Sequence, residues 1–267
     1  MALNPIQLSY SNIDKFLLSI SKYKPYFLKG SPSSIYTFAI LLKEKKCCDI
    51  SFRAIFTTGE SLFPYQKKKI EEIFHCKIAD SYGHMERTVA ICQCPFGRYH
   101  INSDYGILEI DKDKNMPSLG IIAGNVIGTS LYNFTMPLIR YKVGDMIEMF
   151  ADNKVRCECG RGLPVCNKLA GRGQDVIITP DGRMLSNIFI LFDIIKGALW
   201  VQIVQQQADM LKVKLIKGDY FSSSSMEEFL KRLKEIVGTG FRVEIEYLSK
   251  NMLGTLLAQK YKPVVSI

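Results

Sequence analysis

Two short glycine-containing segments each follow an apolar stretch that predicts a β-strand. They carry Thr58, Gly59 and Glu60 in the first segment, and Tyr82, Gly83 and Glu86 in the second. Ligands of open α/β sheets bind at the carboxyl ends of strands, where a glycine lets a flat ligand approach the backbone. A tyrosine there can stack on a base, and a glutamate can hold a hard cation that bridges phosphate oxygens. The pattern indicates a nucleotide site, although each segment alone also fits an ordinary turn.

Another acidic residue, Asp145, follows Gly144 at the end of the segment from 136 to 145. A carboxylate in that place can accept hydrogen bonds from ribose hydroxyls, as acidic residues do in other nucleotide sites. Gly-Asp pairs are also ordinary turn material, and Asp145 taken alone fits a β-turn slightly better. His84, directly after the glycine of the second segment, can either contact a carboxylate ligand or line the pocket.

Cysteines and one histidine form a separate candidate cluster. Cys94 and His100 flank a glycine turn, and Cys157 and Cys159 lie together on another tight loop. A set of such soft or borderline ligands matches tetrahedral zinc, which predicts a structural zinc site.

Other readings of these cysteines stay open. Their spacing is not that of a zinc finger, in which paired cysteines are usually about two to four residues apart. Free cysteines packed around a core His100 are the alternative, since free cysteine is often buried. Cys92 and Cys166 lie close enough in sequence to replace one of the proposed ligands.

The elements that must position these residues follow from the apolar spacing. Residues 13–42 show helical spacing with Gly- and Pro-containing interruptions, which predicts two helices joined by a turn. Apolar runs at 52–56 and 77–81 predict strands, and 64–74 between them returns to helical spacing. This order is typical of an α/β fold with a parallel sheet, and it places both glycine segments directly after strands.

From residue 99 onward the pattern changes to short strand-like runs separated by turn residues, which indicates a β-rich subdomain. Strand and helix patterns then alternate over 172–267, as in a small α+β domain of ferredoxin-like form. We therefore expect an α/β unit over 1–98, the β-rich subdomain over 99–171, and a small α+β domain over 172–267. The serines at 222–225 indicate a local loop.

Composition argues against several classes of protein. No apolar stretch approaches the ~18 to 20 residues of a membrane helix, and no signal sequence is visible, so we expect a soluble cytoplasmic protein. The eight cysteines include the adjacent Cys47 and Cys48, which does not suit a secreted disulfide scaffold. The formal net charge of +9 suits a polyanion, but the lysines lie in small groups beside acidic residues. Solvated helix faces explain that pattern better than a nucleic-acid partner does.

Taken in order, these segments resemble the adenylate-forming superfamily, in particular its phenylacetate-coenzyme A ligase branch with the related capsule-biosynthesis proteins. Residues 23–33 look like the helix and turn that precede the family's Thr-Thr-Gly-Glu loop, and 137–145 is similar to its Pro-Leu-Ile-Arg-Tyr segment. The resemblance runs over nearly the whole chain. It implies the remainder of the family's large AMP-binding domain, 1–171, followed by its small mobile C-terminal domain, 172–267.

The resemblance also implies an activity. Family members activate a small carboxylic acid with ATP and Mg²⁺ to an acyl-adenylate and then transfer the acyl group to coenzyme A. Tyr82 would pack on adenine, Glu86 would bind Mg²⁺ and Asp145 would hold the ribose. Arg172 would lie at the hinge about which the small domain rotates, next to Gln174, where the family usually has an acidic residue. Some members carry a structural zinc in the β-rich subdomain.

The family's catalytic lysine follows a glycine near the C-terminus, and two alignments compete for it here. Gly254 with Thr255 keeps the glycine but loses the lysine, whereas the segment 259–265 keeps a lysine but loses the glycine. We assign the role to Lys260, which would stabilise charge on the acid and the α-phosphate, and interpret Lys262 as a surface lysine.

Nothing in the sequence matches the Ser/Thr/Gly-rich loop that wraps the β- and γ-phosphates in this family. We therefore expect the C-terminal portion of such a ligase, inactive on its own. The alternative is a catalytically incomplete module that binds nucleotide and zinc. The sequence does not identify the acid, and it leaves a homodimer open.

Overall fold

The computed structural model describes residues 2–9, 11–47, 50–118, 121–152, 155–171, 176–180, 184–186, 188–238 and 240–266. Internal contacts divide the chain into two compact units. The first comprises Met1–Arg53, Phe63–Cys76 and Gln174–Ile267, and the second comprises Ala54–Leu62 and Lys77–Gly173. This grouping joins the N-terminal helices with the C-terminal segment. The domains 1–171 and 172–267, and the mobility of the latter, stay predictions.

Helices form the N-terminal part of the first unit. They are η1 (Pro5–Gln7), α1 (Ile13–Tyr23), α2 (Pro32–Glu44) and α3 (Pro64–Phe74), with the short strand β1 (Phe27–Gly30) between α1 and α2. α1 buries Ile13, Phe16 and Ile20, which lie on one helical face. The side chain of Ser31 caps α2 by accepting a hydrogen bond from the Ser34 N–H at 3.4 Å. The turn predicted between the first two helices was therefore wrong in part, because it contains β1.

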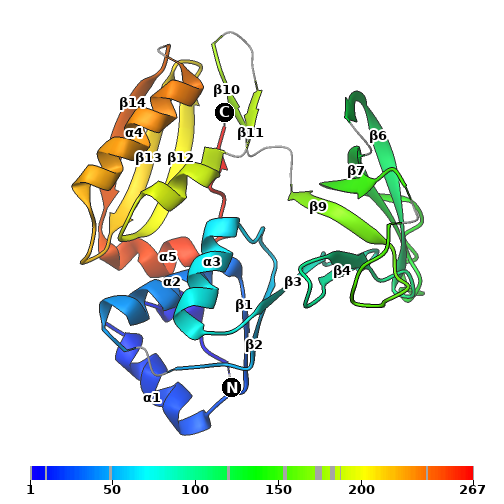
Figure 1. Ribbon diagram of the computed structural model, residues 1–267, viewed down its shortest axis with the longest axis horizontal. Helices are drawn as coiled ribbons and strands as arrows, with labels where there is room; N and C mark the ends of the chain where they lie inside the picture. The colour runs from blue at the N-terminus through cyan, green and yellow to red at the C-terminus, as the bar shows by residue number, and fades with distance from the viewer. Residues whose placement is uncertain are drawn as a thin grey trace. The chain divides into compact units, whose positions relative to one another are not determined.

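The C-terminal part of the first unit is a small α+β layer. Its elements are β10 (Val176–Ile178), β11 (Met184–Ser186), η2 (Ile188–Ile194), β12 (Ala198–Gln207), β13 (Met210–Lys217), α4 (Ser223–Val237), β14 (Arg242–Leu248), η3 (Lys250–Met252), α5 (Leu253–Leu257) and β15 (Val264–Val265). The 4-stranded sheet has the order β14-β13-β12-β15, and β10 pairs with β11 in a separate sheet. Figure 1 shows α4 along one face of the larger sheet.

The core of this layer lies between that sheet and its helices. Phe229 and Leu233 of α4 are fully buried in one cluster with Val213 and Leu215 of β13. Within the described residues, β13, α4 and the parallel strand β14 form one βαβ unit, and η2 stands where a second crossover helix was expected. The serines at 222–225 are not a loop. Ser222 caps α4, because its side chain accepts the Ser225 N–H at 3.3 Å.

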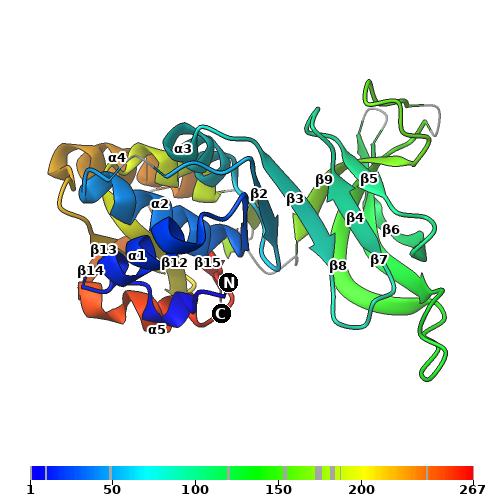
Figure 2. The same cartoon turned by 90° about the horizontal axis from the view of Figure 1, so that it is seen from below.

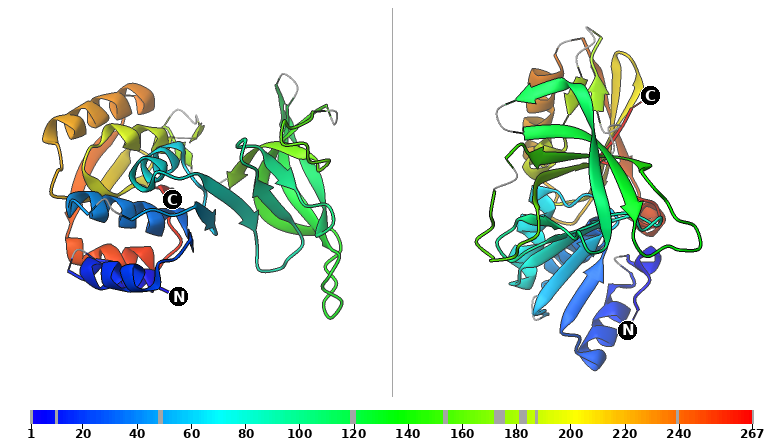
Figure 3. Two further views of the ribbon diagram at one scale, coloured as in Figure 1. Left: turned by 60° about the horizontal axis from the view of Figure 1, so that its bottom comes forward. Right: turned by 90° about the vertical axis from the view of Figure 1, so that its right-hand side faces the viewer.

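The second unit is built on one continuous sheet. Its strands are β2 (Ala54–Thr58), β3 (Ile78–Gly83), β4 (Ala90–Gln93), β5 (Tyr99–Ile101), β6 (Gly106–Ser118), β7 (Ile121–Ser130), β8 (Tyr141–Phe150) and β9 (Val165–Gly171). They follow the order β2-β3-β4-β5-β9-β8-β7-β6. β2 and β3 pair in parallel, as predicted, and the pairs from β3–β4 onward in this order are antiparallel. Figures 2 and 3 show β4 to β9 as a strongly curved sheet.

One expected break in this sheet is absent. The sequence predicts separate strands over 121–126 and 128–131, but β7 runs through Gly124 and Gly128 from Ile121 to Ser130. Both glycines are required by close packing, since a Cβ at Gly128 would lie 2.0 Å from Thr88 Oγ1.

No helix within the described residues is long and apolar enough to cross a membrane.

Candidate functional site

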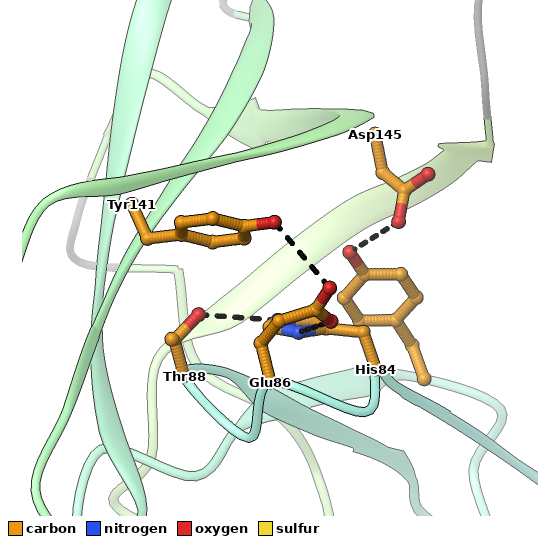
Figure 4. A network of polar contacts seen from close by, with 6 residues as sticks. His84, Glu86, Thr88, Tyr141 and Asp145 are labelled. Carbon is orange, nitrogen blue, oxygen red and sulfur yellow. Dashed lines mark hydrogen bonds and ion pairs between the residues drawn. The ribbon is translucent and has the colours of Figure 1, made fainter. Parts of the chain in front are cut away.

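The end of β3 and the loop that follows it carry two of the predicted nucleotide residues, Tyr82 and Glu86. Tyr82 is the residue before the end of β3, and its hydroxyl donates a hydrogen bond of 2.8 Å to Asp145 Oδ2 on β8. Figure 4 shows Glu86, His84 and Thr88 on the same loop, facing Tyr141 and Asp145. The structure therefore brings together Tyr82, Glu86 and Asp145, which the sequence suggested for base, cation and ribose.

A distortion of β8 aims Asp145 toward this loop. Gly144 has a φ of +84°, and the pairing of β7 with β8 shifts register between Asn125 and Ile127. This arrangement is a β-bulge, a device that redirects a side chain out of the regular alternation. A residue with a Cβ is strained at such a φ, so the glycine before the aspartate is a structural requirement as well as a sequence signal.

Glu86 is held by partners from its own loop and from β8. Tyr141 donates to Glu86 Oε1 at 3.3 Å, and His84 Nδ1 lies 3.1 Å from Glu86 Oε2. The pKa of Glu86 lies below its usual value, chiefly because its own backbone N–H donates to the carboxylate, with further help from His84 and Tyr141. The carboxylate is thus kept ionised and partly exposed, which is the state a hard cation requires.

Thr88 fixes the shape of the loop. It is fully buried, and its Oγ1 lies 3.2 Å from His84 Nε2, so that His84 contacts Glu86 with one ring nitrogen and Thr88 with the other. Thr88 fits against β6 and β7 because a Cβ at Gly106 would meet its carbonyl oxygen at 1.9 Å. The glycines thereby let the loop approach the sheet closely.

Below the loop, a buried carboxylate ties three strands together. Asp80 on β3 is 4% exposed and accepts hydrogen bonds from Thr57 Oγ1 on β2 at 2.5 Å and from Tyr99 Oη on β5 at 2.8 Å. Burial and the Asp80 charge both raise the pKa of Tyr99, so it stays a neutral donor. This network anchors the carboxyl ends of β2 and β3, from which both glycine segments leave.

The first glycine segment lies beside the second. Thr58 is the register partner of Ser81 in the parallel pair, and the Ser81 hydroxyl donates to the Thr57 carbonyl at 3.0 Å. Gly59 has a φ of +86°, and a Cβ added to it would meet no atom within 4 Å, so its role is to turn the chain rather than to allow close packing. Glu60 follows and is partly buried.

Of the two remaining predicted catalytic residues, the structure describes only Lys260. Lys260 is exposed and belongs to the first unit, between α5 and β15. Its segment is fixed on the sheet, because Tyr261 Oη donates to the Val201 carbonyl at 2.5 Å and Gln202 Nε2 donates to the Lys262 carbonyl at 2.8 Å. Arg172 and Gln174, proposed for the hinge, lie outside the described residues.

The predicted metal ligands lie together. The ligand atoms of Cys94, His100, Cys157 and Cys159 are all within 4.8 Å of one another. Cys94 and Cys157 have their sulfurs 3.6 Å apart, and Cys159 Sγ lies 3.3 Å from His100 Nε2. Around a tetrahedral zinc with Zn–S of about 2.3 Å, two sulfurs are about 3.8 Å apart, and a sulfur and an imidazole nitrogen slightly less. The donor set therefore fits zinc in chemistry and spacing.

Local structure prepares this cluster for a cation. Gly97 and Gly160 both have positive φ and turn the two loops back toward the ligands. Burial raises the pKa of the Cys94 thiol, but hydrogen bonds from the Arg98 and Phe96 backbone and from the His100 and Cys157 side chains together lower it to about 6. His100 Nδ1 lies 3.4 Å from the Leu163 carbonyl, which leaves Nε2 for the cluster.

The alternative ligands lie elsewhere. Cys166 is buried in the apolar cluster of Val89, Ile91 and Ile147, and burial raises its pKa to about 12. Cys92 is paired in the sheet with His100 and contacts Asn102 Nδ2 at 3.6 Å. Neither belongs to the group whose ligand atoms converge.

Several residues of this candidate site were given no role from the sequence. Thr88, Asp80 and Tyr99 belong to no motif, and Tyr141 was noted only as the last residue of the Pro-Leu-Ile-Arg-Tyr segment. A polar residue inside an apolar strand, as at Asp80, is the one signal that could have been noticed. Tyr141 lies 55 residues from Glu86 in sequence, and only the fold shows that they meet.

These elements together make up a fold that is known from solved structures. The parallel strand pair, the curved β-rich sheet and the small C-terminal α+β layer together form the fold of adenylate-forming ligases. The chain aligns over 96% of its length with 57% of 2-hydroxyisobutyryl-CoA ligase, solved in the postadenylation state with R3-HIB-AMP, at a TM-score of 0.73 and 20% identity. It also matches the anthranilate CoA ligase AuaEII in complex with anthranoyl-AMP, at a TM-score of 0.61 and 18% identity over 90% of this chain and 49% of that one.

A curated protein is also similar to this chain in sequence. The chain is 25% identical over 252 residues to Protein CapK of Staphylococcus aureus, which covers 90% of this chain and 53% of the relative. The chain thus spans about half the length of the curated relative it matches. No protein-family model matches it. The predicted fold class and the resemblance to the adenylate-forming superfamily are confirmed.

Proposed function

We propose that this chain is the adenylate-binding, C-terminal portion of an AMP-forming acid-coenzyme A ligase. The observation that carries the proposal is the convergence of Tyr82, Glu86 and Asp145 at the carboxyl end of the parallel pair β2–β3. An aromatic ring, an ionised carboxylate and a redirected aspartate are what adenine, a phosphate-bound cation and a ribose require.

The proposed roles follow from the position of each group. Asp145 accepts hydrogen bonds from the ribose hydroxyls, while the Tyr82 ring packs on the base. The turn formed by Thr58, Gly59 and Glu60, together with Gly83, keeps a flat ligand close to the backbone. Arg172, as the hinge residue, and a small mobile C-terminal domain remain proposals drawn from the family.

The proposed chemistry has two steps. A carboxylate oxygen of a small acid attacks the α-phosphorus of ATP, forming the acyl-adenylate and releasing pyrophosphate. The thiol of coenzyme A then attacks the acyl carbonyl, and AMP leaves. Lys260 stabilises the negative charge that develops in the first step, because a cation delivered to a dry site lowers the energy of such a transition state.

Metal ions complete the proposal. Glu86 holds Mg²⁺, whose chemistry there is to neutralise phosphate charge, and the low pKa of the glutamate supports this role. Cys94, His100, Cys157 and Cys159 hold a structural zinc that closes two loops of the β-rich subdomain. Support comes from the converging ligand atoms and from the turns at Gly97 and Gly160.

A second candidate is a module that binds nucleotide without turnover. The sequence contains no Ser/Thr/Gly-rich phosphate loop, and backbone amides of such loops are the usual cradle for β- and γ-phosphates. Under either candidate, adenosine and the α-phosphate are recognised by this chain and the two outer phosphates are not.

Calorimetry with AMP and with ATP, each with Mg²⁺, tests the proposal. AMP is expected to bind at millimolar concentrations, and ATP with an affinity within a few-fold of AMP. An affinity for ATP far above that for AMP would place a phosphate site within this chain. Absence of binding by either nucleotide would end the nucleotide proposal.

A further inference from the structure

A buried glutamate joins the N-terminal helices to the C-terminal sheet within the first unit. Glu44, the last residue of α2, is 7% exposed. Its Oε1 accepts a hydrogen bond of 2.6 Å from the backbone N–H of Asp219, just after β13. Its Oε2 is buried and has no hydrogen-bond partner within the described part of the chain. A buried carboxylate oxygen without a partner is costly, so this joint is not at its optimum.

The turn after β13, at Gly218 and Asp219, leaves room for the carboxylate of Glu44. A Cβ at Gly218 would lie 1.8 Å from Glu44 Oε1, so only glycine lets the carboxylate reach the next N–H. Asp219 itself forms an ion pair with Lys250 of η3. The contact therefore links the end of α2 to both β13 and the segment that precedes α5.

At the other end of α2, packing between the N-terminal helices and the C-terminal sheet is incomplete. Tyr65 of α3 meets Phe192 of η2 edge-on, with ring centroids 6.3 Å apart. Beside them a cavity of about 20 Å³, lined by Tyr36, Trp200 and Tyr261 among others, leaves room for roughly one water molecule. An interface with a cavity at one end of α2 and an unpartnered carboxylate oxygen at the other is held less firmly than a closed apolar core.

We propose that Glu44 is a latch: its carboxylate holds the turn after β13, and with it the C-terminal sheet, against the end of α2, and its unpartnered oxygen keeps this docking reversible. Lys260 lies on the segment that leads into β15, which pairs with β12. The latch therefore also sets where Lys260 stands within the first unit. That last consequence rests on the proposed function, whereas the latch itself does not.

The latch is sensitive to pH. Burial is the largest effect on Glu44 and raises the pKa of its carboxyl, and the nearby negative charge of Asp219 raises this pKa further. Hydrogen bonds from the Asp219 and Tyr220 N–H groups and the positive charge of Lys250 lower the pKa, but the net shift is upward. A carboxyl whose pKa is raised by docking binds its proton more tightly when docked. Docking is therefore strongest at pH values below the undocked pKa of Glu44 and weakens as the pH rises through the docked pKa.

Hydrogen exchange of the whole chain, followed by mass spectrometry and corrected for intrinsic rates, tests the latch. Glu44→Ala removes the acceptor, and the amide of Asp219 should exchange about tenfold faster, as expected for one lost hydrogen bond to a charged group. Glu44→Gln keeps an acceptor but cannot ionise. Its protection at 217–222 should equal or exceed that of the wild type at neutral pH and should not change with pH.

Glu228→Ala, an exposed glutamate on α4, is the matched control and should leave exchange at 217–222 unchanged. Equal protection of Asp219 in wild type and Glu44→Ala would overturn the latch, as would a pH dependence that survives in Glu44→Gln. These outcomes do not involve nucleotide or turnover, so they are independent of the proposed ligase activity.

Discussion

The hydroxyl of Tyr82 donates a hydrogen bond of 2.8 Å to Asp145 Oδ2, and this bond connects the loop after β3 to the bulge in β8. The carboxylate proposed to receive the ribose thus already has a donor. When a nucleotide binds, the ribose hydroxyls must share or replace it.

Two substitutions separate this hydrogen bond from the proposed packing of Tyr82 on the base. Tyr82→Phe keeps the ring and releases Asp145, so AMP should bind severalfold more tightly, since a competing hydrogen bond to a charged group is gone. Tyr82→Ala also removes the stacking surface, worth about 1–3 kcal/mol per base, and should weaken binding roughly tenfold. Calorimetry measures both, and equal affinity of the two variants would rule out stacking by Tyr82.

A second prediction concerns Gly128, whose missing side chain leaves room for Thr88. In Gly128→Ala the new Cβ would lie 2.0 Å from Thr88 Oγ1, so the loop carrying His84 and Glu86 must shift. Overpacking of this kind costs about 1–3 kcal/mol, which urea unfolding can detect. Gly162→Ala is the control, because nothing lies within 4 Å of its Cβ position. A stable Gly128→Ala protein with unchanged AMP affinity would show that this contact does not shape the site.

A third prediction is that purified protein carries about one zinc per chain, as structural sites close with protein ligands only. The double variant Cys157→Ser and Cys159→Ser should lose the metal and lower the thermal midpoint. Cys47→Ser, an exposed cysteine outside the cluster, should change neither. Metal analysis that finds no zinc, or the same content in the double variant, would remove this assignment.

The fourth prediction concerns the two lysines of the C-terminal segment. In any form of the protein that releases pyrophosphate, Lys260→Ala should slow that release about 100-fold, as for other single preorganised charge donors. Transfer to coenzyme A from a preformed adenylate should be spared. Lys262→Ala is the matched control and should retain both activities. Normal adenylation by Lys260→Ala would move the role to another residue.

The sequence predicted local elements best where chemistry and spacing agreed. α3 begins at Pro64 and ends at Phe74 as expected, since proline suits the first helical turn and Gln66 accepts the Phe63 N–H at 3.2 Å. β1 was missed because the 4 residues from Phe27 to Gly30 are too few to show alternation.

Glycine and serine caused the other differences. Gly128 suggested the start of a new strand but lies inside β7, where it allows close approach of Thr88. Ser222 suggested a loop but caps a helix. Residue type alone does not separate these roles, because the same small residues serve turns, caps and close contacts.

Site residues that belong to a sequence motif could be predicted, whereas partners that are distant in sequence could not. Tyr82 and Glu86 lie at the end of β3 and just after it, on either side of Gly83, so their position at this edge of the sheet could be expected. Asp145 instead lies inside β8, where the bulge at Gly144 turns it toward them. Tyr141 and Thr88 became visible only in the folded sheet, since their contacts depend on the register of β7 and β8.

The most direct test of the central proposal is calorimetric titration of AMP, in parallel, into wild-type protein and Asp145→Ala. Wild type should bind at millimolar concentrations. The variant should bind at least about tenfold more weakly, because the ribose loses a charged acceptor. Matched binding by the two proteins, or no binding by wild type at millimolar AMP, would contradict an adenylate site built on Tyr82, Glu86 and Asp145.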